Sequence, residues 1–205
     1  RHAEVMLCAD LFTKEVWTFC GLRTAYVLFV LHLSTRRILL TEATFSPNGL
    51  WMGQMARNLL MSCEDLEIAP RFVVHDRDKL LIWDFDAVLT RAQTKVVKTP
   101  FRAPDANAHA ERWVGSVTGE CLDHLILFGM SSLQRALRAY VGFFNDHRPH
   151  QGIANRIPER RAAGGVPRDC ADQMSDGDLV VECEQFLGGL LNSYYRKACL
   201  LYTSP

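Results

Sequence analysis

The sequence predicts an α/β fold in which a mixed β-sheet is covered by helices on both faces. Three nearly continuous apolar runs follow one another before residue 45, and such runs are typical of strands buried on both sides. Two shorter strand patterns then alternate with helical patterns. With 205 residues, the chain is long enough for one domain of ordinary size and an appendage.

Three predicted strands occupy the start of the chain. Their apolar runs cover Val5–Ala9, Tyr26–Leu33 and Ile38–Thr44. Gly21 and the Ser34–Thr35 pair supply turn or bulge signals between them. Because each run is short and almost entirely apolar, we expect a sheet without a solvated face.

Helical and strand patterns alternate after residue 45. Ser46 is a candidate N-cap, and Pro47 suits the first position of a helix. A short buried strand is predicted at Arg71–His75, and Asp76 follows it directly. The remaining elements are a helix at Phe85–Ala92, a strand at Thr94–Lys98 and a helix that carries Glu111. Three strands, helix, strand, helix, strand and helix is the order of a ribonuclease-H-like fold with a five-stranded mixed sheet.

The helix that carries Glu111 has an apolar stripe and a polar edge. The stripe consists of Trp113, Val114, Val117, Cys121 and Leu125. Asn107, Glu111, Gly115 and Thr118 recur at helical spacing and share the edge beside it. Asn107 and Thr118 are therefore candidates for contacts with a phosphate or an end base. A lone helix Glu is most often a plain surface acid, so the case for Glu111 depends on its neighbours.

Asp10, Asp76 and Glu111 are the candidate site. The two aspartates come at the ends of predicted strands, and Glu111 lies on a helix. A ribonuclease-H-like layer would bring strand ends and helix together, and clustered carboxylates suit Mg²⁺, which prefers oxygen ligands. Other acids lie close by in the sequence, at Asp78, Asp84 and Asp86.

These residues resemble a known family. Asp10 in CADLF, Asp76 in HDRD and Glu111 in NAHAERW resemble the catalytic triad of the retroviral-type integrase core found in bacterial insertion-sequence transposases. Between Asp76 and Glu111 lie 34 residues (111 − 76 − 1), close to the family's usual spacing of about 35. FFNDHRPHQGI, at residues 143–153, resembles the YNxxRPHxxL segment that follows the core in these transposases. The resemblance covers about three quarters of the chain.

The resemblance implies a metal-dependent DNA transposase or integrase. Water attack at a transposon end would free a 3′-hydroxyl, which would then attack target DNA. Two Mg²⁺ or Mn²⁺ ions would stabilise the attacking and leaving oxygens. Asp10 would bridge both ions, Asp76 would hold one and Glu111 the other. The motif singles out Asp76 among the neighbouring acids. The implied partners are transposon ends, target DNA and further copies of the chain, because two ends must be joined in concert.

Basic residues flank the candidate acids although the formal net charge is zero. Lys95, Lys98 and Arg102 lie in a run without acids and are candidates for contacts with the DNA backbone. Arg148 and His150 belong to the segment that follows the core and are further candidates. A charge run is more often a solvated face, so the distribution alone favours DNA only weakly.

The rest of the chain gives weaker signals. Residues 1–125 are predicted to form the catalytic core, and residues 126–158 a helix followed by the RPHQG segment. Residues 159–198 form a tail with a candidate strand at Leu179–Glu184 and a candidate hairpin turn or flexible joint at Leu187–Leu190. Residues 199–205 look like a translated sequencing adapter.

We also expect a fragment of a soluble, cytoplasmic bacterial protein that associates with the nucleoid through DNA. The chain begins at Arg1, and the family normally carries an upstream DNA-binding domain. The seven cysteines show no metal-binding spacing and are expected to be reduced. Two alternatives stay open. One is an inactive DNA-binding remnant, favoured by Lys79-Leu80-Leu81 where the family usually has Thr-Lys-Phe. The other is a ribonuclease-H-like nuclease that joins nothing.

Overall fold

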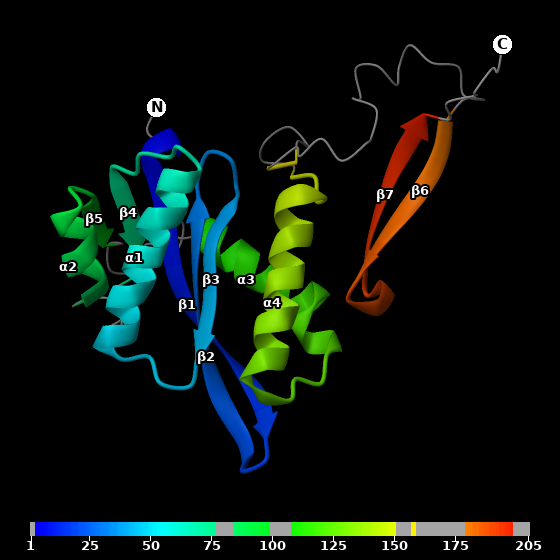
Figure 1. The fold of residues 1–205 in the computed structure, drawn as a ribbon, viewed down its shortest axis with the longest axis horizontal. Helices are drawn as coiled ribbons and strands as arrows, with labels where there is room; N and C mark the ends of the chain where they lie inside the picture. Colours follow the sequence, from blue (N-terminus) through cyan, green and yellow to red (C-terminus); the bar gives the residue numbers. More distant parts are fainter. Residues whose placement is uncertain (1–2, 77–83, 99–107, 151–156, 159–178, 199–205) are drawn as a thin grey trace.

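A five-stranded mixed sheet forms the centre of the protein, as the sequence predicts (Figure 1). The computed structural model describes residues 3–76, 84–98, 108–150, 157–158 and 179–198. The strand order is β3-β2-β1-β4-β5; β1, β2 and β3 are antiparallel neighbours, whereas β4 and β5 run parallel to β1. The strands are β1 (Met6–Thr18), β2 (Gly21–His32), β3 (Ile38–Thr44), β4 (Phe72–His75) and β5 (Lys95–Lys98).

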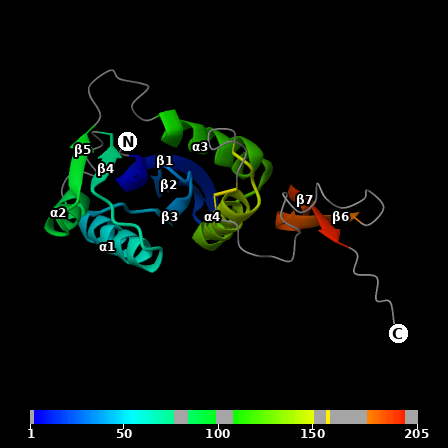
Figure 2. The ribbon, with the colours of Figure 1, turned by 90° about the horizontal axis from the view of Figure 1, so that it is seen from above.

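Helices cover both faces of this sheet (Figure 2). α1 and α2 lie on one face, and α3 and α4 on the other. Their bounds are α1 (Gly49–Asp65), α2 (Asp84–Arg91), α3 (Ala108–Glu120) and α4 (Gly129–Asp146). Short 3₁₀ turns occupy Ala3–Val5, Leu122–His124 and Leu187–Gly189. The result is the three-layer, ribonuclease-H-like architecture predicted from the order of the elements.

The side chains of each central strand alternate between two hydrophobic cores. On β1, Leu7 and Ala9 pack with α1 and α2, whereas Cys8 packs with α3 and α4. On β2, Leu28 joins the first core and Phe29 the second. This period of two explains why the sequence showed continuous apolar runs here, since both faces of the sheet are buried.

The first strand is longer than predicted, which changes the setting of Asp10. We expected a strand that ended near Ala9, but β1 continues to Thr18 and pairs with β2 down to Gly21. Figure 1 shows the ends of β1 and β2 projecting beyond the rest of the sheet. Asp10 therefore lies inside a strand, opposite Phe29, and not at a strand end. The prediction failed because the projecting part is partly solvated, so polar residues interrupt the apolar run there.

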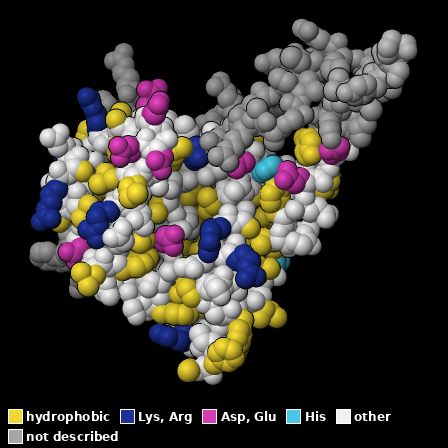
Figure 3. Space-filling model, in the orientation of Figure 1, with side chains coloured by type: hydrophobic (Ala, Val, Ile, Leu, Met, Phe, Trp, Pro, Cys, Tyr) yellow, Lys and Arg dark blue, Asp and Glu magenta, His cyan; other side chains and the backbone are white. Residues whose placement is uncertain are grey.

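The tip of this hairpin carries exposed apolar side chains. Trp17, Phe19 and Phe128 are all at least half exposed, and the rings of Phe19 and Phe128 lie 5.1 Å apart. Figure 3 shows hydrophobic side chains gathered over this end of the molecule. The turn itself is held by Thr18, whose hydroxyl donates to the carbonyl oxygen of Gly21 over 2.7 Å.

Helix α1 begins two residues later than predicted. Asn48, with extended backbone angles, is the N-cap, and its side-chain oxygen accepts a hydrogen bond from Trp51 N over 2.9 Å. Ser46 and Pro47 therefore precede the helix, which corrects their predicted positions as N-cap and first helical residue. Asn and Ser are comparable N-caps, so composition alone could not choose between the two.

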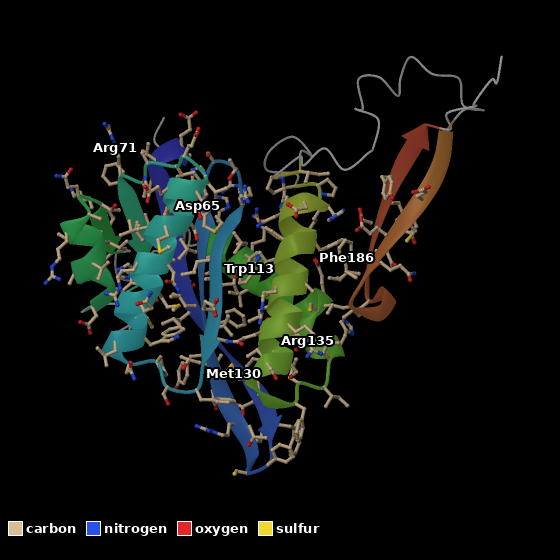
Figure 4. The ribbon with its side chains drawn as sticks, in the orientation of Figure 1. Asp65, Arg71, Trp113, Met130, Arg135 and Phe186 are labelled. Atoms are coloured by element: carbon tan, nitrogen blue, oxygen red, sulfur yellow. The ribbon has the colours of Figure 1, made fainter. Side chains whose placement is uncertain are left out.

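Helix α4 is fixed to the sheet and carries the C-terminal hairpin. Asn145 bonds both backbone groups of Ile38: Ile38 N donates to Oδ1 over 2.9 Å, and Nδ2 donates to Ile38 O over 3.0 Å. Strands β6 (Leu179–Phe186) and β7 (Leu191–Ala198) form an antiparallel pair, so of the two possibilities left open for Leu187–Leu190 the structure has the hairpin turn. Phe186 packs on Phe143 of α4 (Figure 4). Among the described residues, no helix is long and apolar enough to cross a membrane.

Candidate active site

Asp10 of β1 and Asp76, the residue that follows β4, come directly after the last register pair of these two parallel strands. Ala9 of β1 is the register partner of His75 of β4, and each aspartate follows by one residue. Cys8 belongs to the core under α3 and α4, so the alternation of β1 turns Asp10 toward that same face. Val73 belongs to the opposite core, so continuing the alternation of β4 puts Asp76 on the face of Asp10.

The two aspartates differ in exposure. Asp10 is partly buried, and its Oδ1 accepts a hydrogen bond from Leu11 N over 2.8 Å. Asp76 is exposed just beyond the end of β4. Burial, and then the negative charge of Asp10, raise the pKa of the Cys8 thiol to about 12. The charge of Asp10 is therefore felt on the face of the sheet that α3 covers.

Glu111 lies in the first turn of α3, on the helix that covers this face. Trp113 anchors the helix: its ring lies 4.3 Å from that of Phe29 and 6.0 Å from that of Phe12, centroid to centroid. Phe29 is the register partner of Asp10. Figure 4 shows Trp113 between the sheet and α4. Glu111 itself is exposed, so α3 brings it to the aspartates' face of the sheet without burying it.

The three acids are not gathered into one cluster. Within the described part of the chain, no three His, Cys, Asp or Glu side chains lie close enough together to hold a metal ion. The structure thus brings Asp10 beside Asp76 and places Glu111 on the covering helix. Carboxylate oxygens are the donors that Mg²⁺ prefers, so this set of residues fits a hard divalent ion chemically.

The other acids near Asp76 have different surroundings. Asp86 Oδ1 lies 2.8 Å from Nε2 of the fully buried His75, and its Oδ2 lies 3.4 Å from Nζ of Lys98. Asp84 packs so tightly against α1 that a Cβ added to Gly49 would lie 1.9 Å from its Oδ2. Both acids therefore belong to the α1 and α2 side of the sheet. Asp78 lies outside the described residues.

The predicted DNA contacts fall into several groups. Lys95 is exposed on β5, whereas Lys98 pairs with Asp86. Thr118 lies on α3 and is partly buried. Arg102 and Asn107 are outside the described residues.

Arg148 and His150 are built into the structure after α4. Arg148 forms a bidentate ion pair with Glu120 of α3, with Nη2 2.6 Å from Oε1 and Nη1 against Oε2. Arg148 Nη1 also donates to the Tyr140 hydroxyl over 2.8 Å, and that hydroxyl donates to Glu120 over 3.0 Å. Burial is the main cause that raises the pKa of Tyr140. His150 Nε2 lies 3.2 Å from the carbonyl oxygen of Phe144.

Two further basic residues near Arg148 were not predicted from the sequence. Arg36, in the turn between β2 and β3, and Arg112, on α3, lie beside Arg148 around one cavity. Neither was predicted as a binding residue. The Arg36–Arg37 pair in a turn was the available signal, but its proximity to α3 depends on long-range packing.

Comparison with known proteins shows a fold similar to that of integrase and transposase catalytic cores. Residues 92–158 match the integrase core domain family. Among solved structures, the magnesium complex of the HTLV-2 integrase catalytic core in its dimeric form aligns with a TM-score of 0.56 and 10% identity, over 76% of this chain and 93% of that one. The catalytic domain of Mos1 mariner transposase aligns with a TM-score of 0.55 and 12% identity, over 68% and 71%.

A larger assembly gives the same result. The simian T-cell lymphotropic virus intasome, solved with a PP2A regulatory subunit, aligns with a TM-score of 0.51 and 11% identity, over 96% of this chain and 73% of that one. No curated protein sequence matches the chain. Residues 92–158 are thus similar to the integrase core domain family, and the chain has the ribonuclease-H-like fold seen in integrase and transposase catalytic cores.

Proposed function

We propose that this protein is a metal-dependent DNA transposase or integrase that cleaves DNA strands and transfers them to target DNA. The observation that carries the proposal is the register of Ala9 of β1 with His75 of β4, which is followed by Asp10 on one strand and by Asp76 just beyond the other, on the sheet face covered by α3. The family match over residues 92–158 supports it. The structure of the similar HTLV-2 integrase core, which was solved in complex with magnesium, also supports it.

Asp10, Asp76 and Glu111 are the proposed metal ligands. Two bound Mg²⁺ or Mn²⁺ ions would supply electrostatic stabilisation of the attacking and leaving oxygens in phosphodiester transfer. Asp10 would serve both ions because it is central and its carboxylate is oriented by the Leu11 N–H. Asp76 and Glu111, both exposed, would serve one ion each. In this proposal the three carboxylates are the protein's metal ligands, and the reaction involves no covalent protein intermediate.

DNA would be held mainly through its phosphates. Lys95 is exposed at the edge strand β5, and Thr118 shares a helix with Glu111. Such contacts position a duplex without reading its sequence. A homo-oligomer would allow two DNA ends to be joined in concert. The similar HTLV-2 core was solved in dimeric and trimeric forms, which supports this expectation.

A joining assay with Mn²⁺ tests the proposal. A labelled duplex that carries a candidate transposon end is incubated with plasmid, and cleaved and joined products are measured separately. We expect both products from the wild type and neither from Asp10→Asn, Asp76→Asn or Glu111→Gln. The exposed acid Asp65, at the end of α1, provides a matched control as Asp65→Asn, which should retain both.

Two outcomes of this assay would contradict the proposal. Cleavage without joined products would identify a nuclease of the same fold. DNA binding without either product, over several candidate ends and both metals, would identify an inactive DNA-binding protein.

A further inference from the structure

A basic cavity lies on the other side of α3 from Glu111. Its volume is about 560 Å³, and it is bounded by the β2–β3 turn, α3 and the segment after α4. That volume falls within the range of small-molecule sites, roughly 300 to 1,000 Å³. Its polar lining is contributed by Arg36, His109, Arg112, Ser116, Arg148 and His150.

The helical period separates this cavity from the proposed metal site. Each residue of α3 turns by about 100°. Relative to Glu111, Arg112 is therefore turned by about 100° and Ser116 by about 140°, whereas Thr118 returns to within about 20° of Glu111. The cavity and the proposed metal ligand consequently occupy different sides of one helix.

The cavity concentrates positive charge that nearby acids balance only in part. No Asp or Glu among the described residues lines it. Arg148 is paired with Glu120, but neither Arg36 nor Arg112 has an ion pair with a described acid. Burial, and then the charge of Arg112, lower the pKa of Arg36. These guanidinium groups therefore repel one another in the state described.

Two donors at the cavity are also unsatisfied. Nη1 of Arg36 is buried and has no hydrogen-bond partner. Nε1 of Trp113 is likewise buried without a hydrogen-bond partner, and this side chain is only 1% exposed. A buried donor without a partner is costly, and such groups are uncommon in folded proteins. Arg36 is moreover held at φ 64°, a left-handed conformation that is unusual for a long side chain. An anion would relieve both the repulsion and part of the missing hydrogen bonding.

We propose that this cavity binds a nucleotide through its phosphate. Guanidinium forks bind phosphate oxygens in pairs, which suits Arg36 and Arg112. Leu31, Phe144 and Pro149 supply apolar walls for the sugar and base. The nucleotide could belong to a DNA strand or be a free mononucleotide. Only the first case rests on the proposed function, because the second requires no reaction on DNA.

Binding of thymidine monophosphate and of a short single-stranded oligonucleotide tests the proposal. Both titrations are performed without divalent metal, so they do not depend on Asp10, Asp76 or Glu111. Arg36→Asn removes the charge while keeping a residue that tolerates positive φ. Arg112→Gln removes an exposed charge from α3, and Arg36→Lys restores charge without the fork. Arg57→Gln, on α1 at the opposite face of the sheet, is the control.

We expect Arg36→Asn and Arg112→Gln each to weaken binding about tenfold or more, which is the usual worth of a hydrogen bond to a charged group. Arg36→Lys should recover it only in part, and Arg57→Gln should bind like the wild type. Binding of the mononucleotide would identify a free-nucleotide site, and binding of the oligonucleotide alone a DNA-strand site. Equal binding by the wild type and both cavity variants, or an equal loss in Arg57→Gln, would overturn the proposal. These titrations contain no divalent metal, so their result would be the same if Asp10, Asp76 and Glu111 proved not to bind metal.

Discussion

Asp76 follows β4 at the register position that lies beside Asp10 of β1. Carboxylates at adjacent positions on one face repel each other, and this repulsion is relieved by a cation. Because Asp10 lies within the long strand β1, its backbone is fixed by the ladder with β2, next to the last pair of the β1–β4 ladder. The position of one of the two aspartates is therefore set by the centre of the sheet and not by a loop.

The charge of Asp10 should be measurable through Cys8. Burial, and then Asp10, raise the pKa of this thiol from 9.0 to about 12. The raised pKa contributes stability that is complete below pH 9 and is lost as the pH rises toward 12. We expect Cys8 to resist alkylation at pH 8 in the folded protein, while the exposed Cys20 and Cys183 react. Peptide mass spectrometry after timed labelling measures each rate separately.

Asp10→Asn provides the comparison for this prediction. It removes the second cause of the shift and leaves burial, so the pKa of Cys8 should fall and its labelling at pH 9 to 10 should accelerate modestly. Cys63, which is buried in the opposite core, serves as the internal control. An unchanged Cys8 rate with normal folding would show that Asp10 does not face this side of the sheet.

Asn145 should be the main polar anchor of α4. Its side chain satisfies both backbone groups of Ile38 and is 6% exposed. Asn145→Ala would leave a buried N–H and a buried carbonyl unpaired, so we expect the free energy of unfolding to fall by about 2 to 4 kcal/mol. Urea denaturation measures the loss.

Asn58→Ala is the matched control for that change. Asn58 is partly buried on α1 and accepts one side-chain hydrogen bond, from Gln54. Its replacement should change stability by less than about 0.5 kcal/mol. Equal effects of the two substitutions would mean that α4 is held by its apolar contacts alone.

The Arg148–Glu120 pair should contribute modestly to stability because it is partly solvated. The two side chains are 28% and 38% exposed, so screening limits the bidentate pair to about 1 kcal/mol. We expect Arg148→Met to lose about this amount, and the loss to shrink in high salt. A double-mutant cycle with Glu120→Gln measures the coupling between the partners.

Arg138 offers the control for this pair, since it is exposed on α4 and, among the described residues, bonds only the backbone carbonyl of Gln134 in its own helix. Arg138→Met should leave stability nearly unchanged. A coupling energy near zero between Arg148 and Glu120 would contradict a structural role for the pair. Arg148 would then again be a candidate for a contact with the DNA backbone.

Much of this fold could be predicted because its strands are buried on both faces. The apolar runs located β2, β3 and β4 within one or two residues at most ends, with an error of five residues at the start of β2. The same signal failed for β1, where the projecting hairpin exposes part of the ladder and admits Lys14 and Glu15. Local patterns thus report burial and only indirectly report hydrogen bonding.

The candidate site was predictable only in part for a related reason. Asp10 lies in β1 and Asp76 follows β4, two strands whose neighbours could be inferred from the fold class. The partners of Arg148 could not be inferred, because Glu120 lies 28 residues away on another helix. The cavity around Arg36 and Arg112 depends in the same way on the packing of α3 against the β2–β3 turn. Contacts between residues so far apart in the chain leave no periodic pattern in the sequence from which they could be predicted.

The most direct test of the proposed metal site is a calorimetric titration with Mn²⁺ and Mg²⁺. The wild type is compared with Asp76→Asn, Glu111→Gln and the control Asp65→Asn, each checked for folding by circular dichroism. We predict binding by the wild type and the control, and loss of most binding in the other two. A folded wild type that binds neither metal even with DNA present, or equal binding by all four proteins, would contradict the account.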